Sequence, residues 1–346
     1  MQHRILYFGD HNDIHYSKII LTNDQQVSIT LTDLGARILA FLVPNEDRSK
    51  VLNIVDGYDS VQDIFDLHDY YLGATVGRVA GRIASGQFTL EGQSIQLDKN
   101  DGAHHLHGGT DAIDLKKWDF RIEEGNSEIS VVFELEDADG HNGYPGNMYF
   151  QVCHTLNNKN EWSITYNITT DKTTIVNPTN HVYFNLDDED DGIKNHFLQI
   201  NADKYLPIDY QGIPINKKGA NVEGSVFDFR KEKLIVEVLE EDTEQIQVAK
   251  GIDHPFILNE NNEEQLKLSN STNNLAISVV TDAACVVVYT FNYPKAMDSK
   301  RGLHHSVALE TQSLPNAINF EKVPEIIYVS EDRPFYSKTT YKLIMK

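Results

Sequence analysis

Apolar and polar residues alternate along several stretches of the chain. The stretches in which this period of two is clearest are residues 27–31, 129–135 and 162–168. In the first of them Val27, Ile29 and Leu31 are apolar, whereas Ser28 and Thr30 between them are polar. Because successive side chains of a β-strand point to opposite faces, the alternation predicts strands with one apolar face, whose polar residues face solvent or a second layer.

Two other stretches, residues 276–280 and 285–291, are apolar almost throughout. Short runs of this kind are typical of strands that are buried on both faces. The two cysteines, Cys153 and Cys285, lie in apolar alternating runs and are too few for a disulfide framework. We expect both to be small core residues.

Helical signals are few. Residues 60–67 predict one short helix with Ser60 as its N-cap. Residues 234–241 are compatible with either a helix or a strand. The pattern as a whole therefore predicts an all-β protein whose strands form a large antiparallel sandwich.

The domain organisation follows from length and from the lack of internal boundaries. The chain has 346 residues, and no linker rich in proline, glycine or serine divides it. All-β chains of this length often stay as one domain, so we predict a single domain over residues 1–346. The acidic residues 187–191 are expected to form a solvated loop.

The charge balance limits the possible partners. The chain holds 52 acidic and 30 basic residues, which gives a formal net charge of −22. Such a field repels nucleic-acid phosphates and anionic lipids, so neither nucleic acid nor a membrane is expected as a partner. The sequence begins without a signal-peptide pattern, and no stretch approaches the roughly 20 apolar residues of a membrane-spanning helix. We expect a cytoplasmic protein.

Three histidines, His104, His105 and His107, stand just before a glycine pair. On a strand, His105 and His107 would share one face, which is how a cupin-like metal site begins. Such a site also needs a carboxylate, and Asp111 is the only candidate nearby. Metal ligands and ordinary core or surface histidines both remain possible interpretations, and we predict that no metal serves catalysis.

Three further segments concentrate polar groups. Residues 177–185 combine amides and a hydroxyl with the imidazole of His181, and they could simply satisfy one another. Asp253 and His254 stand between a glycine and a proline, at a bend where side chains can converge on a cavity. Glu310 is a lone carboxylate at the end of an apolar run, where burial would raise its pKa unless a partner is present.

Two Gly-Arg steps, at Arg78 and Arg82, lie four residues apart. A guanidinium beside glycine can reach a ligand oxygen with paired donors, or it can brace loops through backbone carbonyls.

The sequence contains no P-loop, no GxGxxG, no Gly-x-Ser-x-Gly and no CxxC pair. Chemistry that depends on those motifs is therefore not indicated.

In their order along the chain, these segments resemble the motifs of the aldose 1-epimerase family. The motifs that carry the resemblance are Leu106-His107-Gly108-Gly109, residues 177–186, Gly251-Ile252-Asp253-His254-Pro255-Phe256 and Leu309-Glu310-Thr311-Gln312. It extends from Leu34-Gly35-Ala36, through residues 81–83 and 142–146, to the C-terminal strands, and so covers nearly the whole chain. Each motif alone is weak, but four at matching spacing are specific.

The resemblance implies a role for each matching residue. Glu310 would be the base that takes a proton from the anomeric hydroxyl, and His181 would be the acid that protonates the ring oxygen. His107 would hydrogen-bond near the reacting oxygens, Arg82 would contact the sugar and Asp253 would bind hydroxyl groups. The implied fold is a β-supersandwich with the site in a cleft on one sheet. The implied substrates are free hexoses such as galactose and glucose, with no cofactor, in a monomer or a homodimer.

Three positions depart from the family pattern. Gly81 stands where many members have asparagine, Phe291 interrupts a Tyr-Thr-Gly-Asn-like segment, and Asn316 replaces a common aspartate. We expect these departures to affect sugar preference and not the reaction.

The residue types also suit ring opening on general grounds. The reaction removes a proton from O1 and donates one to O5, and a carboxylate facing an imidazole supplies both. A non-catalytic sugar-binding protein and a glycosidase, with Asp253 and Glu310 as its carboxylate pair, are the alternatives. A related epimerase of phosphorylated hexoses would need several basic residues around the cleft, and only Arg78 and Arg82 lie close together.

Overall fold

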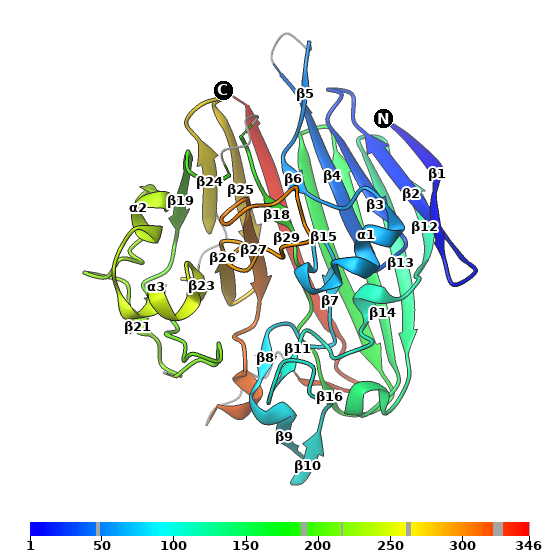
Figure 1. Cartoon of the computed structure of the whole chain (residues 1–346). Helices are drawn as coiled ribbons and strands as arrows, with labels where there is room; N and C mark the ends of the chain where they lie inside the picture. The colour runs from blue at the N-terminus through cyan, green and yellow to red at the C-terminus, as the bar shows by residue number, and fades with distance from the viewer. Residues whose placement is uncertain (46–48, 188–191, 216, 261–263, 321–327, 346) are drawn as a thin grey trace.

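The chain folds mostly into antiparallel β-sheets (Figure 1). The computed structural model describes all residues except 46–48, 188–191, 216, 261–263, 321–327 and 346. The largest sheet has nine strands, in the order β12 (Asp119–Glu124), β13 (Glu128–Asp137), β14 (Met148–Asn157), β15 (Glu161–Thr170), β29 (Phe335–Met345), β25 (Leu275–Thr281), β24 (Leu266–Asn270), β19 (His196–Ile200) and β22 (Lys233–Leu234).

Two smaller sheets pack against this nine-stranded sheet. One has the order β1 (Gln2–His11), β2 (Ile14–Thr22), β3 (Ser28–Thr32), β4 (Arg37–Pro44) and β5 (Val51–Asn53). The other has the order β21 (Ala220–Asn221), β20 (Lys204–Tyr205), β23 (Asp253–Ile257), β26 (Cys285–Tyr289), β27 (Val307–Gln312), β18 (Tyr183–Phe184) and β6 (Val55–Asp56).

Four strand pairs and several short helices complete the described elements. The pairs are β9 (Gln87–Leu90) with β10 (Gln93–Gln96), β8 (Arg82–Ile83) with β11 (His105–Leu106), β7 (Thr75–Val76) with β17 (Thr179–Asn180), and β16 (Thr174–Ile175) with β28 (Tyr328–Val329). The helices are α1 (Val61–Asp66), α2 (Ile235–Leu239) and α3 (Glu244–Ala249), with 3₁₀ turns η1 (His68–Tyr70), η2 (Ala84–Gly86), η3 (Ile113–Leu115), η4 (His141–Gly143) and η5 (Ala317–Asn319). Among the described residues, no helix is long and apolar enough to cross a lipid bilayer.

Aromatic and hydroxyl contacts hold the layers together. Phe41 of β4 meets Trp162 of β15 edge to face, with ring centroids 6.0 Å apart. On the other side, the hydroxyl groups of Thr311 in β27 and Thr339 in β29 are 2.6 Å apart. One cluster of buried apolar side chains runs from Ile19 to Leu343 and includes residues of all three sheets. The nine-stranded sheet is thus the layer that the two smaller sheets share (Figure 1).

The expected secondary structure is largely confirmed. Ser60 caps α1, because its side chain accepts a hydrogen bond from the backbone N–H of Asp63. Residues 234–241, which are compatible with a helix or a strand by sequence, contain the helix α2. Side chains in β15 alternate between buried and more exposed, as their sequence pattern predicts.

Ser28 and Thr30 are buried, so of the two surroundings expected for such residues, solvent and a second layer, solvent is excluded. Three expectations need correction. Cys153 is only half-buried, whereas Cys285 is fully buried. Val280 is 38% exposed, so its run is not buried on both faces throughout.

The acidic segment is the third case. Asp187 is buried and accepts hydrogen bonds from the side-chain amides of Asn195 and Asn270. It is therefore not part of a solvated loop. The remaining four acidic residues of that segment, 188–191, lie outside the described residues.

Candidate active site

Strand β27 presents its two faces to different surroundings. Thr311 points toward the nine-stranded sheet, where its hydroxyl meets Thr339. Because side chains alternate along a strand, Glu310 and Gln312 point the other way, and both line a cavity of about 280 Å³. The family-like motif at the end of this strand therefore places one carboxylate and one amide on the cavity side.

His181 lies directly across from Glu310. It stands between β17 and β18, and β18 pairs with β27 so that Tyr183 faces Ala308. Backbone hydrogen bonds fix the residue, with its N–H donating to the carbonyl of Ala74 and its carbonyl accepting from Gly73. Its ring lies between the rings of Tyr183 and Tyr71, with centroids at 4.9 and 5.9 Å and roughly parallel planes. These contacts set the orientation of the imidazole.

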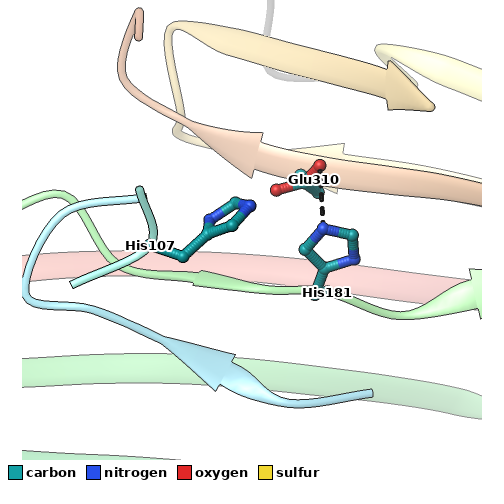
Figure 2. Close-up of side chains that lie close together, drawn as sticks. All are labelled: His107, His181 and Glu310. Atoms are coloured by element: carbon teal, nitrogen blue, oxygen red, sulfur yellow. Dashed lines mark ion pairs between the residues drawn. The ribbon is translucent and has the colours of Figure 1, made fainter. Parts of the chain in front are cut away.

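The imidazole of His181 and the carboxylate of Glu310 form a buried pair (Figure 2). Nε2 of His181 is 3.4 Å from Oε1 of Glu310, and both side chains are almost fully buried. Burial raises the pKa of Glu310 well above its usual value, and the nearby Asp253 raises it further. Burial lowers the pKa of His181 to about 3. Both shifts favour the neutral forms, a protonated carboxyl and an unprotonated imidazole.

His107 approaches the same pair from a loop (Figure 2). It follows β11, and its φ of 51° lies in the left-handed region, which turns its ring toward His181 at a centroid distance of 5.2 Å. The backbone N–H of Gly81 donates to Nδ1 of His107 at 3.2 Å. Burial lowers the pKa of His107 well below its usual value, so the ring is neutral. A neutral ring that accepts at Nδ1 must carry its proton on Nε2, which makes His107 a hydrogen-bond donor at Nε2.

Arg82 and Asp253 also line the cavity. The Nε of Arg82 donates to Asp101 at 2.7 Å, and one of its terminal nitrogens lies 4.0 Å from Asp253. Burial raises the pKa of Asp253, and the Arg82 guanidinium offsets part of that rise. Gly212 packs against the guanidinium so closely that a Cβ there would lie 2.7 Å from it. The arginine is thus held between two carboxylates while it still lines the cavity.

The five residues that the sequence singled out come together in this one cavity. Glu310, His181, His107, Arg82 and Asp253 all line it, although they lie on five separate segments. The remaining lining residues are Asp69, Tyr70, Tyr71, Gly81, Leu106, Tyr183, Ile208, Gly212, Pro255, Val287, Tyr289, Tyr293, Lys295, Gln312 and Pro315. Their mixture of aromatic and hydrogen-bonding groups is typical of a pocket for a small polar ligand.

Comparisons with known proteins give the family of the chain. A sequence model of the family described as Aldose 1-epimerase matches residues 17–342. The chain belongs to the aldose 1-epimerase family. The chain is 38% identical to the aldose 1-epimerase of Haemophilus influenzae over 314 residues, 88% of each protein. It is 35% identical to that of Escherichia coli over 338 residues, 95% of each. A crystal structure of galactose 1-epimerase from Lactobacillus acidophilus superposes with a TM-score of 0.89, at 32% identity and 99% coverage of both chains.

For this member of the aldose 1-epimerase family, the structure separates the histidines of the first cluster. His105 is buried between Asp98 and the hydroxyl of Tyr144 and does not line the cavity. His104 accepts a hydrogen bond from the backbone N–H of Ser85. Only His107 reaches the cavity, because β11 ends at Leu106 and the chain then turns. Two histidines on one face of a strand, as in a cupin-like metal site, are therefore not formed.

The proposed carboxylate of that metal site lies elsewhere too. The side chain of Asp111 is 65% exposed and pairs with Lys116. A different group, His107, His181 and Glu310, has possible ligand atoms within 4.8 Å of one another. A metal on Nε2 of His107 would require that ring to give up its hydrogen bond from Gly81. The geometry therefore suits hydrogen bonding by His107 better than ligation.

The other polar residues of the motifs have structural partners. Arg78 is buried, donates to Asp137 and to three backbone carbonyls, and does not line the cavity. His254 is buried against Gln245. In the segment around His181, the side chains of Asn177, Thr179, Asn180 and Asn185 donate to backbone carbonyls of neighbouring segments. These side chains therefore form hydrogen bonds with other segments and not mainly with one another. The bonds hold the segment that carries His181 in place.

The three departures from the family pattern have local explanations. Gly81 has a φ of 73°, a region open to glycine and also tolerated by asparagine. Phe291 has a φ of 50°, which favours glycine, but its ring packs against Tyr70 at a centroid distance of 4.9 Å. The side chain of Asn316 accepts from the backbone N–H of Ala84, as an aspartate would. Of the three, only Gly81 lines the cavity.

Sequence reasoning missed several residues of the cavity wall. The ring of Tyr71 lies against those of His107 and His181, yet Tyr71 stands in no motif and its φ of 54° has no sequence signal. Tyr293 and Lys295 come from a loop after β26. Gln312 stands in the motif Leu309-Glu310-Thr311-Gln312, but the motif implies no role for it. Only its alternation with Glu310 along the strand could have indicated that both side chains share a face.

Proposed function

We propose that this protein interconverts the α and β anomers of free hexoses, with galactose and glucose as substrates. The observation that carries the proposal is the buried pair of His181 and Glu310, at 3.4 Å, in a cavity that also holds His107, Arg82 and Asp253. The reaction needs one base and one acid within reach of the same acetal carbon. The pair supplies both.

Ring opening breaks the bond between C1 and O5. Glu310, as the carboxylate, takes the proton from the anomeric hydroxyl, and the C1–O1 bond becomes a carbonyl. His181, as the imidazolium, gives its proton to O5. The open-chain aldehyde then rotates about C1–C2 and presents its other face to O5. Closure runs the same proton transfers in reverse, and the product is the other anomer.

The pair needs one shared proton throughout this cycle. The cyclic sugar is bound while the proton is on His181, and the open-chain form exists while the proton is on Glu310. Burial raises the pKa of Glu310 and lowers that of His181, so it favours the shared proton on Glu310. This is the proton distribution of the open-chain complex, and burial therefore favours the state that ring opening produces. Hydroxyl donors of the cyclic sugar would stabilise the carboxylate instead.

The other residues bind and orient the sugar. The neutral His107 donates from Nε2 and contacts the reacting oxygens without changing its charge. Arg82 donates to sugar oxygens, and Asp253 accepts from hydroxyl groups. Such positioned proton transfers are worth about 10² to 10⁴-fold in rate. That suffices for mutarotation, which already proceeds in plain water.

Three wider features belong to the same proposal. An uncharged sugar is not repelled by a chain of net charge −22, whereas a sugar phosphate would be. We propose that the enzyme works without a cofactor, as one domain over residues 1–346, in a monomer or a homodimer. We place the reaction in the cytoplasm.

Polarimetry tests the proposal. Freshly dissolved α-galactose and α-glucose are followed to equilibrium with and without the protein. The proposal expects a rate that rises in proportion to enzyme concentration and an unchanged final rotation. Methyl galactosides serve as the control, because they lack a free anomeric hydroxyl. Turnover of a galactoside, or no acceleration for either free sugar, would contradict the proposal.

A further inference from the structure

Gln312 is a buried amide that the reaction described above does not use. It is the last residue of β27, two positions after Glu310, and it lines the same cavity. Its side chain is 2% exposed. Neither the oxygen nor the nitrogen of its amide has a hydrogen-bond partner among the described residues.

This lack of partners is unusual for a buried side chain. An unsatisfied buried polar group costs about 1 to 3 kcal/mol, so most are paired. Nearby polar groups follow that rule: the hydroxyl of Thr311 meets Thr339, and the side chain of Asn177 both donates to and accepts from the backbone of Ser313. The neighbour of Gln312 on β26 is Cys285, whose weakly polar thiol offers little to an amide.

The position of the amide relative to the other sugar-binding groups is informative. Asp253 pairs with Tyr289, and Tyr289 pairs with Ala308. Asp253 therefore lies toward the Ala308 end of β27, whereas Gln312 lies at the opposite end, with Glu310 between them. A ligand beside Glu310 therefore has Asp253 toward one end of β27 and Gln312 toward the other.

We propose that Gln312 is a sugar-binding residue whose carboxamide binds a hydroxyl group of the hexose other than the anomeric one. The proposal rests on the function proposed above. A hydroxyl group is both a hydrogen-bond donor and an acceptor. The carboxamide of glutamine can accept with its oxygen and donate with its NH₂ group, and it carries no charge. Gln312 thereby holds the sugar at the end of β27 opposite to Asp253, and it contributes to the choice among hexoses.

The test replaces the amide by an apolar side chain of similar size, Gln312→Leu. We expect KM for galactose to rise about three- to tenfold, with kcat within about threefold of wild type. The melting temperature of the sugar-free enzyme should not fall, because the variant removes an unpaired buried amide. A residue with a merely structural role would show the opposite, a lower melting temperature and an unchanged KM.

Monodeoxy sugars identify the contact. KM for the 2-, 3-, 4- and 6-deoxy analogues of galactose is measured with wild type and Gln312→Leu. For the analogue that lacks the contacted hydroxyl, wild type and Gln312→Leu should have the same KM. For each of the other analogues, the KM of Gln312→Leu should remain higher than that of wild type. An equal effect of the substitution on every analogue, or on none, would overturn the proposal.

A matched control is Thr174→Val. The hydroxyl of Thr174 is also buried and also lacks a partner among the described residues, but Thr174 does not line the cavity. This variant should keep KM for galactose unchanged.

Calorimetric binding of galactose to wild type and Gln312→Leu tests the contact independently of turnover. Active wild-type enzyme with unchanged binding by the variant would refute only the role of Gln312, whereas inactive wild-type enzyme would refute the proposed function.

Discussion

Two pairs of a histidine and a carboxylate, His105 with Asp98 and His181 with Glu310, differ in what else they contact. His105 uses both ring nitrogens, with Nδ1 at 2.8 Å from Asp98 and Nε2 at 2.7 Å from the hydroxyl of Tyr144. His181 approaches Glu310 at 3.4 Å, and its Nδ1 has no partner among the described residues. The second carboxylate oxygen of Glu310 has none either.

The difference separates groups that hold the fold from groups that are available to a ligand. The carboxylate of Asp98 also accepts from the backbone N–H and the hydroxyl of Thr110, so the pair with His105 closes a loop. The pair of His181 and Glu310 does not close a loop in this way, and both residues line the cavity. Unsatisfied hydrogen-bonding capacity inside a cavity is costly to the fold, and it is kept where a substrate supplies the partners.

The largest effect is expected for Glu310→Gln. This change keeps the shape of the side chain and removes the base, so kcat should fall by at least roughly 10²-fold. The free energy of unfolding should not decrease, because burial raises the pKa of Glu310 and so already penalises the charged form of the wild-type carboxyl. Initial mutarotation rates and urea denaturation measure the two quantities. Normal turnover by this variant would exclude Glu310 as the base.

His181→Asn is the next largest. Because the proton of His181 moves mainly in the transition state, kcat should fall by about 10²-fold while KM changes far less. Rates at a series of galactose concentrations separate the two parameters. If kcat stays within a few-fold of wild type, His107 becomes the better candidate for the acid.

Asp253→Asn should affect binding rather than chemistry. Its proposed contact with sugar hydroxyls exists in the ground state and in the transition state alike, so KM should rise by about tenfold with little change in kcat. The same rate series reports both values. A fall in kcat comparable to that of Glu310→Gln would instead support a two-carboxylate mechanism.

The smallest effect on activity is expected for a change in the pair of His105 and Asp98. His105→Leu leaves Asp98 and the buried hydroxyl of Tyr144 without one partner each, which should lower the free energy of unfolding by about 1 to 3 kcal/mol. The value of kcat per folded molecule should stay within about threefold, because Gly81 holds His107 independently. Urea denaturation and mutarotation assays check this. A loss of kcat as large as that of His181→Asn would remove the distinction between the two pairs.

Much of the fold could be predicted from local pattern. The alternation around Trp162 predicts β15, and Ser60 predicts the start of α1, because both signals depend on residues a few positions apart. The burial of Ser28 and Thr30 could not be predicted, since it depends on the layers that cover both faces of β3. Tertiary packing, and not local sequence, decides such cases.

The candidate site was predictable only as a set of residues. The motifs indicated Glu310, His181, His107, Arg82 and Asp253, but single motifs could not tell which histidine faces the cavity. That choice depends on the left-handed turn at His107, and the tautomer depends on the N–H of Gly81. Partners from distant segments create both features, so no local pattern carries them.

In the proposed mechanism, Glu310 and His181 act as one unit that shares a single proton. A double-mutant cycle tests it most directly, with kcat measured for Glu310→Gln, His181→Asn and the variant that carries both changes. Residues that act as a unit are far from additive, so the double variant should have a kcat within a few-fold of the slower single variant. If the two losses multiply instead, each residue works independently, and the shared-proton account is wrong.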